Sequence, residues 1–158
     1  MIPHVFSIEP IGKVRHDVPD AEVSRRRSEL VAEIELETRF AAGLAGIDAY
    51  SHLIVLFWMH RVPVAPWQPL VRPRGRNDLP LTGIFATRMR DRPNPIGLAV
   101  CELLGRDRDR LRVRRLDAYN GSPVLDIKPY DHYDLCTEIA VPDWWTRMTR
   151  HPSPTRPL

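Results

Sequence analysis

The prolines restrict the fold of this chain most, because they are numerous and scattered along its length. Sixteen of the 158 residues are proline. Each one fixes its own φ, lacks a backbone N–H and is poorly tolerated inside a helix. The sequence therefore predicts short helices, strands of modest length and long connections.

Two stretches alternate apolar and polar residues with the period of a β-strand. In residues 31–37 the apolar side chains alternate with three glutamates, and in residues 109–116 Leu111 and Val113 alternate with arginines. This period is typical of a strand with one buried face. Half-exposed strands are therefore expected at both places.

Further segments complete a mainly β chain. Residues 51–60 are apolar on both faces, which favours a strand in the middle of a barrel or sandwich. Additional strands are expected at 82–88, 97–104 and 124–130, a helical turn or two within 39–50, and a long Pro- and Arg-rich loop at 61–80. The Asn-Gly pair at 120–121 is a strong hairpin signal. One small β domain with short helices and long loops is the prediction.

Length and composition set the organisation of the chain. With 43% hydrophobic and 27% charged residues, a single folded domain is expected over 1–150, followed by a flexible proline-rich tail at 151–158. Cys101 and Cys136 are isolated, and the longest apolar run, 53–59, is too short to cross a bilayer. The N-terminus lacks signal-peptide features. A cytoplasmic protein without a membrane segment is predicted.

The basic residues are almost all arginine. The chain has 21 arginines, two lysines and a formal charge of +3. Guanidinium groups suit carboxylates and phosphates, whereas codon bias is an equally good explanation of the excess. The alternating arginines at 110, 112 and 114 indicate a solvated strand face, with an RNA-facing surface as the alternative.

Several common kinds of site are not predicted. His52 and His60 bracket one strand and would lie roughly 26 Å apart, too far to share a metal ion. The sequence contains no G-x-S-x-G, Walker A or G-x-G-x-x-G pattern. A metal site, a serine hydrolase triad and the common nucleotide-binding folds are therefore not expected.

Residues 85–97, FATRMRDRPNPIG, combine features that favour a ligand-binding loop. Three arginines two apart would share one side of an extended chain: Arg88, Arg90 and Arg92. Asn94 lies between two prolines that hold the backbone out of the helical region. The alternative is that the prolines only stiffen an edge connection, with Asn94 satisfying nearby backbone groups.

The same residues resemble a known family. Residues 83–97 are similar to the signature G-V-F-A-T-R-x-x-x-R-P-N-P-I-G of the TsaA-like, or TrmO-like, proteins. Residues 10–15, 46–61 and 120–130 resemble three further motifs of that family, in the same order. The resemblance spans roughly residues 8 to 130.

This resemblance implies a small β-barrel methyltransferase that uses S-adenosylmethionine and usually forms a homodimer. The family's best-known activity is methylation of N6 of threonylcarbamoyladenosine at position 37 of tRNA. The extra C-terminal domain of longer members is expected to be absent here. tRNA recognition would then fall to the barrel, the 61–80 loop or a partner subunit.

The resemblance also implies the cofactor-binding residues. They are His60 and Arg61, Arg88, Leu98, and the turn formed by Asn120, Gly121, Ser122 and Pro123. Asn120 stands where the family usually has aspartate. The family's Pro-Arg-Gln motif has no clear counterpart, and an ungapped count matches only Arg26.

The chemistry limits what the arginines can do. Methyl transfer from a sulfonium requires in-line placement and exclusion of water rather than a specialised acid–base pair. Because cations repel a sulfonium, Arg88 is expected at the polar end of the cofactor. Arg90 or Arg92 is expected to bind the substrate carboxylate, and Asn94 or the amides of the 120–122 turn to bind adenine or ribose. No catalytic residue is assigned, and Tyr130 and Asp126 are equal candidates for the proton acceptor.

Three alternatives remain at the level of sequence. The first is a methyltransferase whose acceptor is a small molecule rather than tRNA. The second is a barrel that binds RNA without catalysis. The third is a plain β domain whose arginines reflect codon bias.

Overall fold

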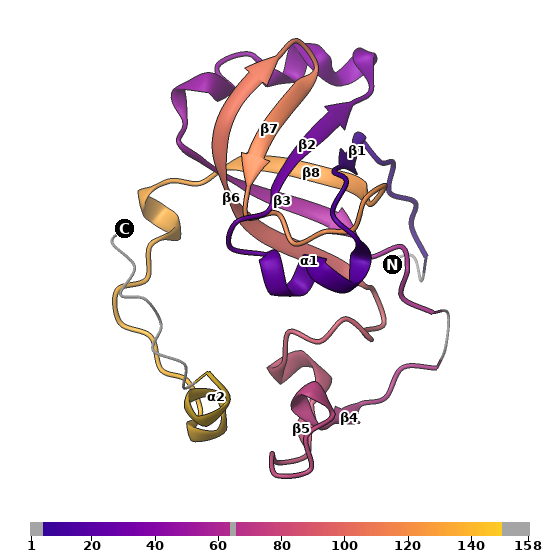
Figure 1. The fold of residues 1–158 in the computed structure, drawn as a ribbon, viewed down its shortest axis with the longest axis vertical. Coiled ribbons are helices and arrows are strands. Elements are labelled where there is room, and N and C mark those ends of the chain that lie inside the picture. Colours follow the sequence, from indigo (N-terminus) through magenta and orange to yellow (C-terminus); the bar gives the residue numbers. More distant parts are fainter. Residues whose placement is uncertain (1–4, 64–65, 150–158) are drawn as a thin grey trace.

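A closed, six-stranded antiparallel barrel forms the centre of the computed structural model, which describes residues 5–63 and 66–149 (Figure 1). Around the barrel the strand order is β1-β2-β7-β6-β3-β8. The strands are β1 (Gly12–Arg15), β2 (Val31–Leu36), β3 (His52–Trp58), β6 (Ile96–Asp107), β7 (Arg110–Arg114) and β8 (Pro123–Pro129). The expected mainly β barrel is confirmed. The tail expected at 151–158 lies outside the described residues.

The barrel interior follows from the period-two patterns. The apolar face of β2 is buried, and Leu111 and Val113 of β7 are fully buried opposite it. Leu53, Val55 and Phe57 of β3 point into the same core, whereas the other face of β3 is half-buried. The strands predicted at 31–37, 51–60 and 109–116 are therefore confirmed, with one core face each.

The helices are short, as the prolines predict. α1 (Asp20–Arg26) buries Val23 against the barrel core, and α2 (Asp143–Met148) lies near the C-terminal end of the described chain. The turns predicted within 39–50 are 3₁₀ helices, η1 (Thr38–Leu44) and η2 (Ile47–Ala49). In the described part of the chain, no helix is long and apolar enough to cross a membrane.

A small lobe, residues 66–84, projects from one end of the barrel (Figure 1). The loop predicted at 61–80 is partly ordered there, because β4 (Leu70–Val71) pairs with β5 (Thr82–Gly83). The 3₁₀ turn η3 (Pro73–Gly75) forms the first part of the loop that joins them. Pro73, Leu79 and Ile84 are buried, so the lobe has a small core of its own.

The strand predicted at 82–88 is wrong beyond Gly83. The chain turns into η4 (Ile84–Ala86), and Thr87 closes that turn by donating from its N–H and its Oγ1 to the carbonyl oxygen of Ile84. Residues 87–95 then contain no regular element. Local hydrogen bonds of a threonine outweigh the apolar pattern here.

The Asn-Gly pair forms a turn but not a hairpin. The flanking strands β7 and β8 are not paired with each other, because β8 pairs with β1 and β3. Gly121 adopts φ +82°, which favours glycine, and its N–H donates to Val14 of β1. The turn is therefore tied to the first strand of the barrel.

Candidate functional site

A pocket of about 200 Å³ lies where the end of β3, α1 and the 117–122 segment meet. Its lining is mixed, with apolar, aromatic, hydroxyl and charged side chains. The lining residues are Val23, Ser24, Phe57, Met59, Arg61, Val62, Arg90, Asp117, Ala118, Tyr119 and Ser122. Four segments far apart in sequence, at 23–24, at 57–62, at Arg90 and at 117–122, therefore converge on one cavity.

His60 connects two of the predicted cofactor motifs. Its Nδ1 lies 3.2 Å from Oγ of Ser122, which is 1% exposed. Its Nε2 accepts from Nε of Arg61 at 3.4 Å, so the proton of the neutral ring sits on Nδ1 and is donated to Ser122. Burial, and then the charge of Arg61, lower the pKa of His60, while Asp20 opposes them. A neutral imidazole is thereby favoured.

Arg61 is held in place from two sides. Its guanidinium forms an ion pair with Asp20 of α1 and lies 5.8 Å from the centre of the Tyr119 ring. The pair fixes α1 against the end of β3. It also neutralises much of the positive charge of Arg61 at the pocket edge.

Asp117 is an acidic side chain that sequence reasoning missed. It lines the pocket and makes no ion pair among the described residues. The negative charge of Asp117 also affects the buried Cys101 in the barrel. Burial, and secondarily Asp117, raise the pKa of the Cys101 thiol to about 12. The sequence offered one clue to Asp117, which is that it lies three residues before the Asn-Gly turn.

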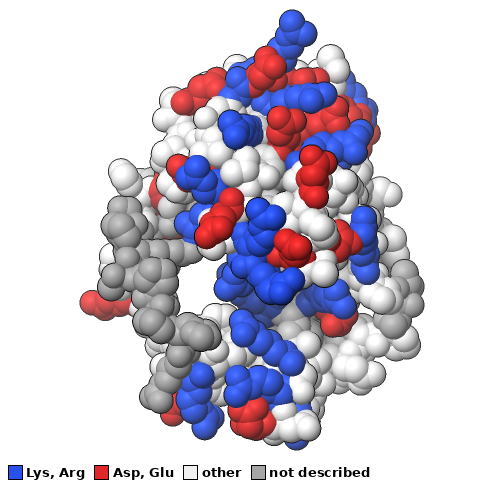
Figure 2. Space-filling view, in the orientation of Figure 1, with Lys and Arg blue, Asp and Glu red and all other residues white. Residues whose placement is uncertain are grey.

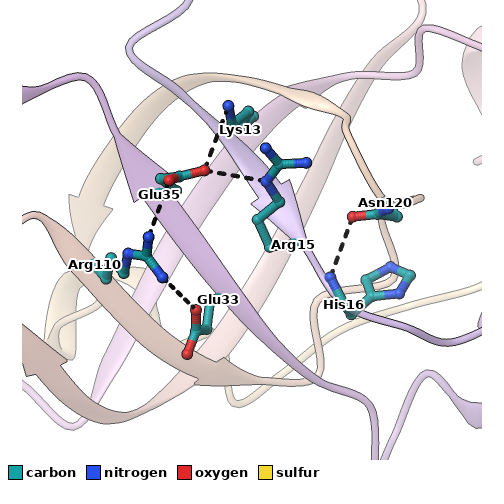
Figure 3. A network of polar contacts seen from close by, with 7 residues as sticks. All are labelled: Lys13, Arg15, His16, Glu33, Glu35, Arg110 and Asn120. Carbon is teal, nitrogen blue, oxygen red and sulfur yellow. Dashed lines mark hydrogen bonds and ion pairs between the residues drawn. The ribbon is translucent and has the colours of Figure 1, made fainter.

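The turn at 120–123 uses most of its polar groups internally. The N–H groups of Gly121 and Ser122 donate to the carbonyl oxygens of Val14 and Tyr119. These two amides are therefore already used, although the sequence predicted that they would bind adenine or ribose. The side-chain oxygen of Asn120 accepts from the backbone N–H of His16 at 3.3 Å (Figure 3). The hydroxyl of Ser122 therefore remains as the group that faces the pocket.

The three arginines of the motif point to three different places, because their segment is not extended. Arg88 donates to the carbonyl oxygen of Leu98 at 3.2 Å, which brings two predicted cofactor residues together outside the pocket lining. Arg90 lines the pocket. Arg92 donates to the carbonyl oxygens of Thr87 and Met89 and holds its own turn.

The proline-flanked asparagine lies beside the end of β3. The N–H of Met59 donates to the carbonyl oxygen of Pro95 at 2.8 Å, and Trp58 pairs with Ile96. Asn94 is exposed, and its amide makes no hydrogen bond within the described residues. The alternative in which Asn94 satisfies nearby backbone through its side chain is therefore not what the structure contains.

A close backbone approach shapes one wall of the pocket. The Phe57 ring lies over Gly97, where an added Cβ would be 2.2 Å from Cζ of the ring. Glycine at this position lets the ring lie against β6 while it lines the pocket.

The remaining candidates lie elsewhere. Arg26 pairs with Glu22 and lines a separate groove with Arg15, His16 and Arg112. Asp126 pairs with Lys128, and neither Asp126 nor Tyr130 lines the pocket. In residues 5–63 and 66–149, no three His, Cys, Asp or Glu side chains are grouped to hold a metal ion.

Comparison with known proteins gives the family. The model of the tRNA-methyltransferase O N-terminal domain matches residues 12–134. The chain therefore belongs to this family, and the TsaA-like resemblance is confirmed.

Two curated relatives illustrate the similarity. An S-adenosyl-L-methionine-binding protein of Archaeoglobus fulgidus is 43% identical over 126 residues, covering 78% of this chain and 88% of that protein. A tRNA (adenine(37)-N6)-methyltransferase of Escherichia coli is 36% identical over 135 residues, covering 79% of this chain. This chain spans 57% of the length of that enzyme.

A solved structure shares the fold. A crystal structure of TrmO superposes with a TM-score of 0.70 at 30% identity and covers 87% of this chain. This chain spans 63% of the solved one. The barrel seen here is thus the fold of an experimentally determined relative.

Proposed function

We propose that this protein is an S-adenosylmethionine-dependent methyltransferase that methylates N6 of threonylcarbamoyladenosine at position 37 of tRNA. Its relatives are named as binders of this cofactor and as adenine-37 N6 tRNA methyltransferases. One structural observation carries the proposal: the hydrogen bond between His60 and Ser122 joins two distant family motifs at one pocket. Residues 1–150 are proposed to act as one domain.

The pocket residues fit part of this cofactor. Apolar and aromatic side chains, Phe57, Met59 and Tyr119, suit the adenine, and the Ser122 hydroxyl offers a hydrogen bond. Asp117 supplies a negative charge toward a cationic sulfonium or ammonium group, whereas Arg61 is already paired with Asp20. When bound, the cofactor supplies an electrophilic methyl group.

The volume of the pocket supports a homodimer. About 200 Å³ is below the roughly 300–1,000 Å³ of typical ligand sites, so the pocket holds only part of the cofactor. Exposed apolar side chains at the two ends of the motif segment, Phe85, Ile96 and Leu98, offer a surface for a second copy. A second copy there would lie against Arg88 and Leu98, two of the predicted cofactor residues that do not line the pocket.

Arg90 is the preferred residue for the substrate carboxylate. It lines the pocket, and its pairing with Asp91, at 3.8 Å, is loose. Arg92 is less suited, because its Nη1 is engaged by two carbonyl oxygens of its own turn. We also propose that Asn94, whose side chain is exposed, binds the adenine or ribose of the substrate. Because the acceptor is a tRNA, the enzyme is proposed to act in the cytoplasm.

Nucleoside analysis of tRNA from a deletion strain tests the acceptor. We expect N6-methylated threonylcarbamoyladenosine to disappear and to return when the wild-type gene is restored. Unchanged levels of this nucleoside would reject the tRNA acceptor and favour a small-molecule acceptor.

A further inference from the structure

Positive charge is concentrated in the lobe and the adjoining motif. Residues 66–97 contain six arginines and two aspartates, a formal charge of +4, although the whole chain carries only +3. The rest of the chain is therefore slightly acidic. Figure 2 shows Lys and Arg gathered from the middle of this face down over the lobe, whereas the upper barrel is mixed red and blue.

Several arginines of the barrel are neutralised by carboxylates. Glu35 forms ion pairs with Lys13, Arg15 and Arg110 (Figure 3), and Arg114 pairs with Glu102 at 2.7 Å. The hydrogen bond from Arg15 is the main reason that the pKa of Glu35 is lowered, so this carboxylate stays charged. These groups form a balanced surface.

Three arginines of the lobe and motif bind peptide carbonyls instead, whereas Arg76 pairs with Asp78 and Arg90 loosely with Asp91. Arg72 donates to Leu79 at 2.7 Å, and Arg88 and Arg92 likewise donate to backbone oxygens. A carbonyl oxygen orients a guanidinium but does not cancel its charge. The excess of +4 therefore remains available to an anionic partner.

The tip of the lobe, residues 72–76, presents this charge on a fixed support. The β4–β5 pair, the buried Pro73 and Leu79 and the Arg72 bond hold the tip. Arg74 is exposed at φ +54° and has no ion-pair partner among the described residues. Its side chain is thus free to contact a phosphate.

The chain leads directly from the tip to the pocket. β5 returns from the tip, and Arg90, seven residues after Gly83, lines the pocket. In Figure 1 the lobe lies beyond the end of the barrel at which α1 is found, and Val23 and Ser24 of α1 line the pocket, so the lobe and the pocket belong to the same end of the molecule.

We propose that the tip of the lobe binds the phosphodiester backbone of the RNA substrate while the target nucleoside enters the pocket. This inference rests on the proposed function. A second copy is the less suitable occupant of the tip, because a two-fold interface centred there would place Arg72, Arg74 and Arg76 of one copy against the same arginines of the other. Phosphates match both the sign of the charge and the geometry of guanidinium groups.

Arg74→Asn tests the proposal, because asparagine tolerates positive φ, so the substitution removes the guanidinium group without straining the backbone. Arg108→Asn is the matched control: Arg108 is also exposed at φ +55° but lies in the β6–β7 turn. Binding of an in vitro transcribed tRNA is measured over a series of salt concentrations. For Arg74→Asn we expect roughly three- to tenfold weaker binding and a salt slope smaller by about 1. Arg108→Asn is expected to bind like the wild type.

Each other outcome has a distinct meaning. If Arg74→Asn binds tRNA like Arg108→Asn, or if its main effect is to change the oligomeric state, the RNA-binding tip is wrong. If binding depends on Arg74 but the wild-type protein methylates no tRNA nucleoside, the proposed enzyme activity fails and the RNA surface stands. Cofactor affinity should be equal in all three proteins.

Discussion

The barrel and the motif segment, residues 85–97, use the same side chains in opposite ways. In the barrel, apolar residues alternate into a core and arginines pair with glutamates on its surface. In the motif segment the backbone is irregular, and arginines are held by carbonyl oxygens or turned into the pocket. The barrel's interactions stabilise the fold, whereas those of the motif segment orient groups for a ligand.

The largest effect is expected from a core truncation in the barrel. Leu111→Ala removes a fully buried side chain and should lower the free energy of unfolding by about 2–5 kcal/mol. Arg90→Ala, in the pocket, should leave this free energy nearly unchanged while weakening substrate binding. Urea unfolding of both variants checks the contrast. Equal losses of stability would show that the two regions are not separable in this way.

Gly97→Ala probes the boundary between the two regions. The new Cβ would overlap the Phe57 ring, which must shift within the pocket wall. A loss of about 1–3 kcal/mol is expected, together with weaker cofactor binding. Gly43→Ala, where a Cβ meets no atom within 4 Å, is the control for glycine replacement. Cofactor affinity and stability that both stay at wild-type values would refute the packing argument.

Asp117→Asn asks whether the pocket carries a counter-charge. Affinity for S-adenosylmethionine should fall about two- to fivefold, as expected of one partly exposed charge pair. If Asp117 faces the sulfonium, S-adenosylhomocysteine, which lacks that charge, should be affected less. Calorimetric titration of both ligands measures the difference, with Asp107→Asn as a control outside the pocket lining. A variant that binds S-adenosylmethionine like the wild type would remove Asp117 from the site.

His60 gives the smallest effect and a defined sign. Because its pKa is lowered on folding, the unfolded chain binds more protons near this pKa, so stability should rise with pH. The contribution is fully present above the unfolded pKa of about 6.5 and is lost as pH falls from there through the lower pKa of the folded state. His60→Gln should reduce the stability difference between about pH 5 and about pH 7. If the stability difference between the two pH values is as large in His60→Gln as in the wild type, other titratable groups are responsible for it.

The barrel strands were predictable because a buried face imposes period two on the sequence. The strand predicted at 82–88 failed because Thr87 closes a local turn that alternation does not encode. The hairpin predicted at Asn120–Gly121 failed because the turn is bound to β1, more than a hundred residues earlier in the chain.

The site was predictable only in part. His60, Arg61 and Ser122 follow from the family motifs, and the structure brings them together. Asp117, Phe57 and the α1 residues that complete the lining depend on three-dimensional contacts without a sequence pattern. The direction of each motif arginine likewise depends on which carbonyl oxygen it meets.

A crystal structure with bound S-adenosylmethionine tests the central claim most directly. We predict that the methyl donor lies against His60, Asp117 and Ser122, between the end of β3 and the turn that follows β7. Donor density confined to another place, such as the groove beside Arg15 and Arg112, would contradict the account.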